Sequence, residues 1–344
     1  MNGYGGGVQI SSDAVISNNI ISNNAVTSSY MGSFGGGISI FGGTSSISNN
    51  IISNNTASSS EAISRGGGLH VAGGIVTISK NVINSNSLYT SYWCWYDKTC
   101  YGGGIDIGGS AVTISNNTIS NNTALNASAI SYYDVPDNKD IRFNLITANN
   151  SIDLSQTYTI YTNSHPLFNF NNIFNNTAAY SLWNDTPQGS TNVNAENNWW
   201  GSATELSSWA YDWVDNATKG IVDYAPWTTA IRTDAPISPP TGLYATAGMG
   251  QTSLTWTANT EADTAGYKVY WSTTSGFPYA NSVDVGNVTS YTISALPAGT
   301  YYVTVTAYDT TYNSANNDPT TIVNDNQTNG NESWYTMEQV VNVP

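Results

Sequence analysis

Charge is scarce in this chain of 344 residues, and positive charge is scarcest of all. Lysine and arginine together number 8 against 23 aspartates and glutamates, so the net charge is -15, and only 9% of the residues are charged. Nucleic acids and anionic lipid surfaces are held chiefly by lysine and arginine. The composition therefore excludes a nucleic-acid-binding protein, and it argues against a polyanionic sugar ligand unless cations bridge the two.

Long hydrophobic runs are also missing. No apolar stretch approaches the roughly 18 residues that a membrane helix needs, so we expect no direct membrane insertion. The first residues, Met1 to Gly5, contain neither a basic stretch nor an apolar segment, so we expect no signal peptide and a mature or truncated chain. Hydrophobic residues nevertheless make up 40% of the sequence, which is enough to bury a core.

Cysteine and histidine occur only twice each, at positions too scattered for a zinc site. Cys94 and Cys100 lie close together in an aromatic segment of an otherwise cysteine-free chain. This spacing favours a local disulfide, and with it an oxidising, extracellular or cell-surface location. Two free thiols are the alternative.

Asparagine and threonine are abundant, and they create many sequons for N-linked glycosylation. Many sequons arise by chance in such a chain, so a glycoprotein is a hypothesis only. The candidate sites are Asn54, Asn116, Asn121, Asn126, Asn149, Asn175, Asn184, Asn216, Asn287, Asn326 and Asn331.

A repeat dominates the first two thirds of the sequence. Gly-Gly-Gly begins at residues 5, 35, 66 and 102, and each triplet is followed by the same pattern. Aligning the copies gives four apolar columns, which are Val8/Ile38/Leu69/Ile105, Ile10/Ile40/Val71/Ile107, Ile16/Ile47/Ile78/Ile114 and Ile21/Ile52/Ile83/Ile119. It also gives two asparagine columns, which are Asn19/Asn50/Asn81/Asn117 and Asn24/Asn55/Asn86/Asn122.

These columns predict a right-handed parallel β-helix. Alternating β-branched residues have the period of a strand, and three short strands per copy bury a face only when copies stack. Stacked isoleucines then fill the interior, and stacked asparagine amides hydrogen-bond along the axis. Asparagine also tolerates left-handed turns. A flat β-sandwich with a coincidental repeat would not give six columns over four copies.

The repeat decays after the fourth copy but continues to residue 201, so we count about seven coils within residues 1–235. The pattern resembles the parallel β-helix repeats of extracellular proteins, such as pectate-lyase-like enzymes and polymorphic outer-membrane proteins. The segment from Asn197 to Gly201, Asn-Asn-Trp-Trp-Gly, is similar to the closing coil of such helices. The resemblance implies a fold and leaves the function open.

A second domain is expected at residues 236–344, after a proline-rich linker. Short alternating strands around Trp256, Tyr267, Tyr291 and Tyr302 indicate a β-sandwich. They resemble a fibronectin type III domain, which implies a spacer or adhesive module. We expect a long asparagine-rich insertion at about 313–332 and a final strand from Trp334 to Val343.

Catalytic candidates are few. His70 and Asp106 occupy outward positions on adjacent coils, about 5 Å apart by strand spacing, and would form an acid–base pair. No arginine or second carboxylate stands beside them in the aligned columns, as a lyase or glycosidase would need. A solvated pair on an exposed sheet is the alternative, so we predict no catalytic residues beyond these weak candidates.

Two further sites are predicted on loops. Asp134, Asp137, Asn138 and Asp140 supply the hard oxygen ligands that calcium prefers, and an ordinary polar turn is the favoured alternative. The loops at 25–34, 56–65 and 87–101 should lie on one side of the helix. The third carries the aromatics that we expect to bind a glycan or partner protein, or else to cover the helix flank. They are Tyr92, Trp93, Trp95 and Tyr96.

Together these features predict a non-catalytic structural or adhesive surface protein, with glycans or other surface proteins as partners. Regular coil sequence begins at Gly5, leaving no room for a capping helix, so we expect either that the protein continues upstream or that the bare end pairs with a neighbouring copy. The second case is self-association into a filament, sheath or lattice. The alternative is a polysaccharide-binding or polysaccharide-degrading enzyme that works on the face of the β-helix.

Overall fold

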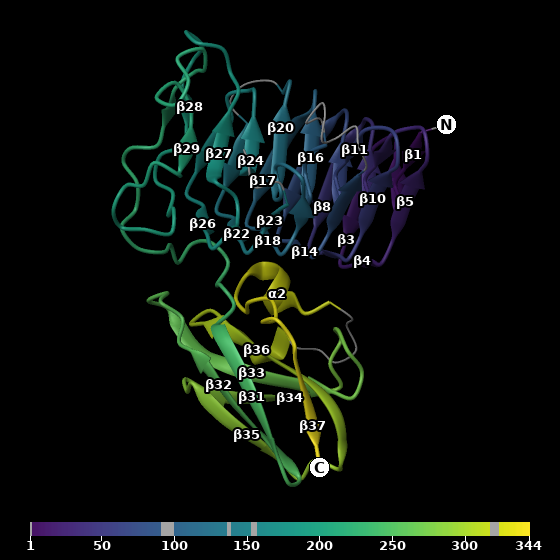
Figure 1. Ribbon diagram of the computed structural model, residues 1–344, viewed down its shortest axis with the longest axis vertical. Helices are drawn as coiled ribbons and strands as arrows, with labels where there is room; N and C mark the ends of the chain where they lie inside the picture. The colour runs from purple at the N-terminus through teal and green to yellow at the C-terminus, as the bar shows by residue number, and fades with distance from the viewer. Residues whose placement is uncertain (1, 91–99, 136–138, 153–156, 317–322) are drawn as a thin grey trace. The chain divides into compact units, whose positions relative to one another are not determined.

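The computed structural model describes residues 2–90, 100–135, 139–152, 157–316 and 323–344. The chain divides into two compact units, Met1–Ala235 and Pro236–Pro344. The first is a parallel β-helix of about seven coils, as the repeat predicts, and strands follow one another along it in coil after coil (Figure 1). The second is built from antiparallel sheets.

Three long parallel sheets form the body of the β-helix. The first contains β2 (Val8–Ile10), β7 (Ile38–Ile40), β12 (Leu69–Val71), β16 (Ile105–Gly108), β20 (Ile130–Tyr133), β24 (Tyr158–Thr162), β27 (Tyr180–Asn184) and β29 (Ala210–Tyr211). The second contains β3 (Ala14–Ser17), β8 (Thr44–Ser48), β13 (Ile75–Ser79), β17 (Ala111–Ser115), β21 (Asp140–Arg142), β25 (Leu167–Asn169), β28 (Val193–Asn194) and β30 (Val222–Asp223). The third contains β4 (Ile20–Ser22), β9 (Ile51–Ser53), β14 (Val82–Asn84), β18 (Thr118–Ser120), β22 (Leu145–Thr147) and β26 (Asn172–Phe174).

The four apolar columns of the repeat form the core, as predicted. Strand register places Leu69 on Ile105 and Ile78 on Ile114, so like residues stack on like residues in successive coils. Most members of the columns are fully buried and belong to one continuous cluster. Each buried isoleucine stabilises the fold by roughly 2 kcal/mol relative to an exposed one, so the stacked columns help to stabilise strands that are short.

The expectation of three strands per coil is wrong for the first coils. The segments 25–34 and 56–65, which we expected to be loops, contain strands of two further parallel sheets. The fourth sheet contains β5 (Ala25–Ser28), β10 (Thr56–Ser59), β15 (Ser87–Thr90), β19 (Thr123–Ala124) and β23 (Asn150–Ser151), and the fifth contains β1 (Gly3–Tyr4), β6 (Ser33–Phe34) and β11 (Ser64–Arg65). Polar runs form strands here because their hydroxyls pair across coils, as Thr56 and Ser87 do at 2.9 Å.

The glycine triplets are needed for three different reasons. In each triplet the first glycine has a positive φ, between 56° and 80°. The second has no room for a side chain: a Cβ on Gly67 would lie 2.5 Å from the Gly103 carbonyl oxygen and 2.6 Å from that of Ser87. The third lies against a stacked asparagine, since a Cβ on Gly68 would meet the Asn86 amide at 3.0 Å. The triplets therefore allow the left-handed turn and the close approach of neighbouring backbone and of a stacked asparagine.

Two ladders of asparagine side chains run along the β-helix, and the predicted columns are their first members. In each ladder the side-chain Nδ2 and the backbone N–H of one asparagine donate to the Oδ1 of the next, at distances of 2.8–3.3 Å. The first ladder is Asn19, Asn50, Asn81, Asn117, Asn144, Asn171 and Asn198. The second is Asn24, Asn55, Asn86, Asn122, Asn149 and Asn176.

The residue before each ladder asparagine takes the left-handed conformation. In the regular coils this residue is usually asparagine, such as Asn116 with φ 56°. In the decayed coils the same φ is kept by residues that resist it, including Phe143 at 56° and Ala148 at 55°. The ladder hydrogen bonds therefore hold the turn even where the local sequence disfavours it.

The second unit is an antiparallel β-sandwich, which confirms the expected fold class. One sheet contains β31 (Thr241–Gly248), β32 (Gln251–Thr257) and β35 (Ser290–Ser294), and the other contains β34 (Asn281–Gly286), β33 (Thr264–Ser272), β36 (Gly299–Asp309) and β37 (Gln339–Val343). Alternate residues of these strands, such as Trp256, Val269 and Val305, form the core between the sheets.

The other face of the four-stranded sheet is covered as well. The segment after β36 contains a 3-10 turn, η1 (Ser314–Asn316), and a short helix, α2 (Asp325–Asn329). The final strand begins at Gln339 and not at Trp334 as predicted. Trp334 is buried instead, and its ring packs against Phe277 and Tyr335. Trp334, which the sequence pattern placed at the start of a strand, therefore holds the covering segment in place.

Candidate functional site

One column of side chains on the first sheet points away from the core, and it contains the catalytic candidates His70 and Asp106. Strand register aligns it through the eight strands from β2 to β29. The column is polar in the early coils and aromatic in the late ones. Its members are Gln9, Ser39, His70, Asp106, Ser131, Tyr161, Trp183 and Tyr211.

The structure brings His70 and Asp106 together. They are register partners on β12 and β16, and the imidazole Nδ1 lies 2.8 Å from Asp106 Oδ2. The expectation of a solvated pair is wrong, because His70 is 4% exposed and Asp106 is fully buried. The rings of Phe34 and Phe41 cover the imidazole, with centroids 5.0 and 6.4 Å from it.

Unused hydrogen-bonding groups surround this pair. Among the residues that the structure describes, Asp106 Oδ1 and the hydroxyls of Ser39 and Ser131 are buried without a partner. Burying a polar group without a hydrogen-bond partner costs about 1–3 kcal/mol. Fold stability therefore does not explain why these groups gather at one place, and they mark a candidate functional site. A histidine whose Nδ1 is held by a carboxylate has the arrangement of an oriented general base.

An arginine lies closer to this region than the aligned columns indicated. Arg65, on β11, places its guanidinium carbon 4.3 Å from the ring centre of Tyr133. Burial raises the pKa of the Tyr133 hydroxyl, and the negative charge of Asp106 raises it further, whereas Arg65 lowers it. The arginine was missed because β11 belongs to the fifth sheet, which the repeat did not predict.

The aromatic residues of the late coils form a second region, which we call the aromatic strip. Tyr101 stacks on Tyr161 with centroids 4.9 Å apart and planes within 6°, and Trp183 stacks on Tyr211 at 3.6 Å and 8°. Trp183 and Tyr211 stack because they are register partners on the adjacent strands β27 and β29, and a coil spacing of about 4.8 Å brings aromatic faces into contact. The strip consists of Tyr101, Tyr158, Tyr161, Tyr180, Trp183 and Tyr211.

The ring hydroxyls and neighbouring charges give the strip a polar rim. The Tyr161 hydroxyl donates to Asp185 at 3.1 Å, and Asp185 is also ion-paired with Lys219. Tyr180 donates to Asp215 at 3.3 Å. Burial, followed by the charge of Asp185, raises the pKa of Tyr161, so its hydroxyl stays a neutral donor. Tyr158, Tyr161 and Trp183 are at most 9% exposed, so a ligand can reach the strip only at the partly exposed Tyr101, Tyr180 and Tyr211 and at the carboxylates beside them.

The predicted binding residues Tyr92, Trp93, Trp95 and Tyr96 lie outside the described residues. Tyr101, where this loop rejoins the β-helix, is part of the aromatic strip.

The cysteine pairing also stays a prediction. Cys100 is disulfide-bonded and buried, and its Sγ accepts the Ser64 backbone N–H at 3.3 Å. Cys94, the other cysteine of the sequence, lies outside the described residues.

Two of the four predicted calcium ligands, Asp137 and Asn138, are likewise outside the described residues. Asp134 accepts a hydrogen bond from Asn163 at 3.0 Å, and Asp140 is ion-paired with Arg142 at 3.1 Å. Within the described ranges, no group of three or more histidine, cysteine, aspartate or glutamate residues is placed to hold a metal ion.

The sequons divide into two groups by burial. Asn126, Asn149, Asn184 and Asn326 are fully buried. Asn149 belongs to the second ladder, so a glycan there would break the ladder and is incompatible with this fold. The other seven are at least partly exposed and stay candidates.

No protein-family profile matches the chain, and no curated protein matches it. An Fn3-like protein from Clostridium thermocellum has 25% identity and a TM-score of 0.23, over 32% of this chain and 96% of that one. The chicken CNTN1 FN1-FN3 domains have 17% identity and a TM-score of 0.24, over 31% and 32% of the two chains. The Clostridium perfringens spore cortex lytic enzyme SleM has 17% identity and a TM-score of 0.22, over 53% and 55%.

These TM-scores are too low to carry a functional argument, and the fold assignment above comes from strand order and register alone. No helix within the described ranges is both long and apolar enough to span a membrane.

Proposed function

We propose that this protein is an extracellular, adhesive surface protein that binds neutral glycans along the aromatic strip without chemically altering them. The observation that carries the proposal is the strip itself, where the hydroxyls of Tyr161 and Tyr180 donate to Asp185 and Asp215 at its edge. Carbohydrate ligands present both apolar ring faces and many hydroxyls, and such a surface complements both.

Charge narrows the ligand class. The chain carries a net charge of -15, and both carboxylates on the polar rim are acceptors. Acidic sugars would meet repulsion from the whole surface and from the rim, so neutral hexose polymers are the expected ligands. The β-sandwich then has the role of a spacer or second adhesive module.

Replacing Tyr211 by alanine should weaken glycan binding roughly tenfold, equivalent to about 1.4 kcal/mol. Tyr211 is partly exposed and covers one face of Trp183, so its removal changes the strip without opening the core. A neutral-glycan array identifies the ligand, and calorimetry on the two proteins measures the change.

Tyr30→Ala is the matched control, because Tyr30 is 74% exposed on the same β-helix and away from the strip. Equal affinities for Tyr211→Ala and the unmodified protein would contradict the proposal, as would an array with no neutral glycan bound.

A second candidate function, polysaccharide cleavage, is favoured by the buried His70–Asp106 hydrogen bond and the unpaired Asp106 Oδ1. Incubation with neutral and acidic polysaccharides separates the two. The adhesive proposal expects no new reducing ends and no unsaturated products. Products that form with the unmodified protein and vanish with Asp106→Asn, which keeps the shape of the side chain, would establish the enzyme instead.

A further inference from the structure

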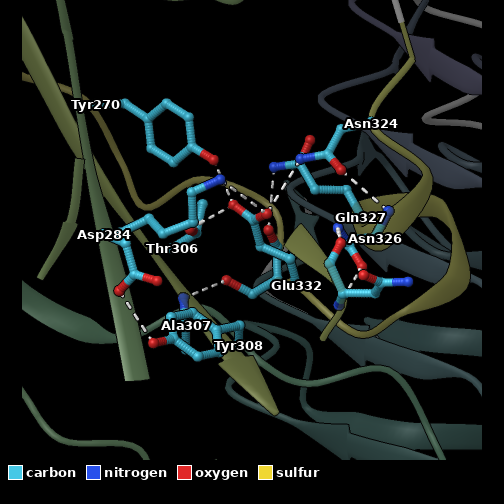
Figure 2. Close-up of polar contacts among 12 residues, drawn as sticks. Tyr270, Asp284, Thr306, Ala307, Tyr308, Asn324, Asn326, Gln327 and Glu332 are labelled. Carbon is cyan, nitrogen blue, oxygen red and sulfur yellow. Dashed lines mark hydrogen bonds and ion pairs between the residues drawn. The ribbon is translucent and has the colours of Figure 1, made fainter. Parts of the chain in front are cut away.

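A buried carboxylate organises the space between the four-stranded sheet of the sandwich and its covering segment. Glu332 is 1% exposed, and Figure 2 shows it at the centre of a polar cluster. It accepts hydrogen bonds from the hydroxyls of Tyr270 at 2.5 Å and Thr306 at 2.7 Å. Its Oε2 also faces two nitrogen atoms, Asn324 Nδ2 at 3.1 Å and Lys268 Nζ at 3.5 Å.

Lys268 is unusually deeply buried for a lysine. Lys268 lies on β33 at an outward position, yet only 6% of it is exposed, because the covering segment closes over it. Its Nζ lies 5.0 Å from the ring centre of Tyr270 and 5.5 Å from that of Tyr312. Aromatic walls exclude water, and in such surroundings transfer of the ammonium proton to an adjacent carboxylate removes two buried charges at once. The product of that transfer is a nucleophilic amine.

Asn324 is positioned so that its side-chain amide carbon, Cγ, can act as an electrophile. Asn324 is the N-cap residue of α2, and its Oδ1 accepts the backbone N–H of Asn326 at 3.0 Å. A donor aimed at a carbonyl oxygen stabilises the negative charge that develops there during attack on the carbon. The Nδ2 of the same amide meets Glu332 Oε2, the oxygen that also contacts the lysine. Nucleophile, proton carrier and electrophile therefore converge on one oxygen atom.

We propose that Lys268 and Asn324 form an intramolecular isopeptide bond with Glu332 as the proton carrier. Glu332 takes a proton from Nζ, which attacks Cγ of Asn324, and the oxyanion on Oδ1 is held by the Asn326 N–H. Glu332 then passes this proton to Nδ2, and the Cγ–Nδ2 bond breaks. The departing ammonia takes the second proton that Nζ loses on becoming an amide nitrogen, and it leaves as ammonium. An amide and an amine give a new amide and ammonia, so no oxidant, metal or cofactor is required.

The bond would join β33 to the covering segment just before α2. These two points are neighbours in the fold but are separated by about half of the sandwich sequence, including β34, β35 and β36. A covalent link there closes a large loop and keeps the covering segment on the sheet when the chain is pulled.

The test is the mass of the full chain, produced in bacteria without glycans and with its cysteines reduced. Loss of ammonia makes the folded protein about 17 Da lighter than its sequence. Proteolysis should release a branched peptide that contains both Lys268 and Asn324. The variants Lys268→Arg and Glu332→Gln should recover the full mass, and Lys219→Arg, a matched lysine outside the cluster, should not.

A succinimide at Asn329-Gly330 would lose the same mass, so Asn329→Gln must keep the loss if the inference is right. Folding of each variant is checked by circular dichroism, and the unmodified protein gives the decisive result in any case. Full sequence mass after prolonged incubation of the folded protein would overturn the inference. A mass loss that persists in Lys268→Arg would overturn it too.

Discussion

Replacing Asn117 by alanine is expected to lower the free energy of unfolding of the β-helix by roughly 4 kcal/mol. Its Nδ2 donates to the carbonyls of Ile78 and Ser115 and to Asn144 Oδ1, and its Oδ1 accepts two hydrogen bonds from Asn81. Alanine removes all five and leaves buried groups of both neighbouring coils without partners, each of which costs about 1–3 kcal/mol. Denaturant titration followed by circular dichroism measures the change.

The preceding residue provides the control. Asn116 has the same chemistry, but its φ is 56° and it serves the turn rather than the ladder. Asn116→Gly should change stability by only a few tenths of a kcal/mol, since glycine accepts that φ freely. Similar losses at the two positions would show that the ladder contributes no more than an ordinary turn residue.

Gly67→Ala is expected to be at least as severe, with no folded β-helix recovered or a loss above roughly 4 kcal/mol. A Cβ there would lie 2.5 Å from the Gly103 oxygen and 2.6 Å from the Ser87 oxygen. Both atoms are backbone carbonyl oxygens, one on β15 and one in the glycine triplet of the next coil, where Gly103 accepts the Gly68 N–H at 3.1 Å, so neither moves without disturbing the hydrogen bonds between coils.

Gly42→Ala is the comparison, because a Cβ at that turn meets nothing closer than the Ser11 oxygen at 3.8 Å. It should leave the melting temperature unchanged or raise it slightly, since alanine narrows the unfolded ensemble. A Gly67→Ala protein that folds and has the same melting temperature as Gly42→Ala would refute the close approach of the coils.

The core and the ladders were predictable because a β-helix repeats its contacts. Ile78 packs on Ile47 and Ile114, its own equivalents in adjacent coils, so a column in the alignment is already a column in space. The repeat does not predict contacts between residues at non-equivalent positions of the coils. Arg65 and Tyr133 meet across elements that the repeat does not align, and their contact has no periodic signal.

The aromatic strip was missed for a related reason. Tyr161, Trp183 and Tyr211 are register partners, but their coils have lost the glycine triplets that anchor the alignment. Counting residues back from the ladder asparagines would have recovered part of the strand register of the first sheet in these late coils. In the sandwich, the sequence pattern does not indicate that Lys268 is buried. Its burial follows from the covering segment, which an outward position on a strand does not reveal.

The two asparagine ladders also have an electrical consequence. In every side-chain amide of the ladders, Oδ1 accepts from the preceding coil and one Nδ2 hydrogen is donated to the next coil, so the amide carbonyls point the same way. The other Nδ2 hydrogen is donated to a backbone carbonyl, such as that of Ile78 for Asn117. Strand dipoles largely cancel within a sheet, but aligned amides add, as peptide units do in an α-helix. The coil axis therefore carries a dipole whose positive end lies at the late coils. The acidic residues follow that field: residues 2–34 contain only Asp13, whereas residues 196–234 contain Glu196, Glu205, Asp212, Asp215, Asp223 and Asp234.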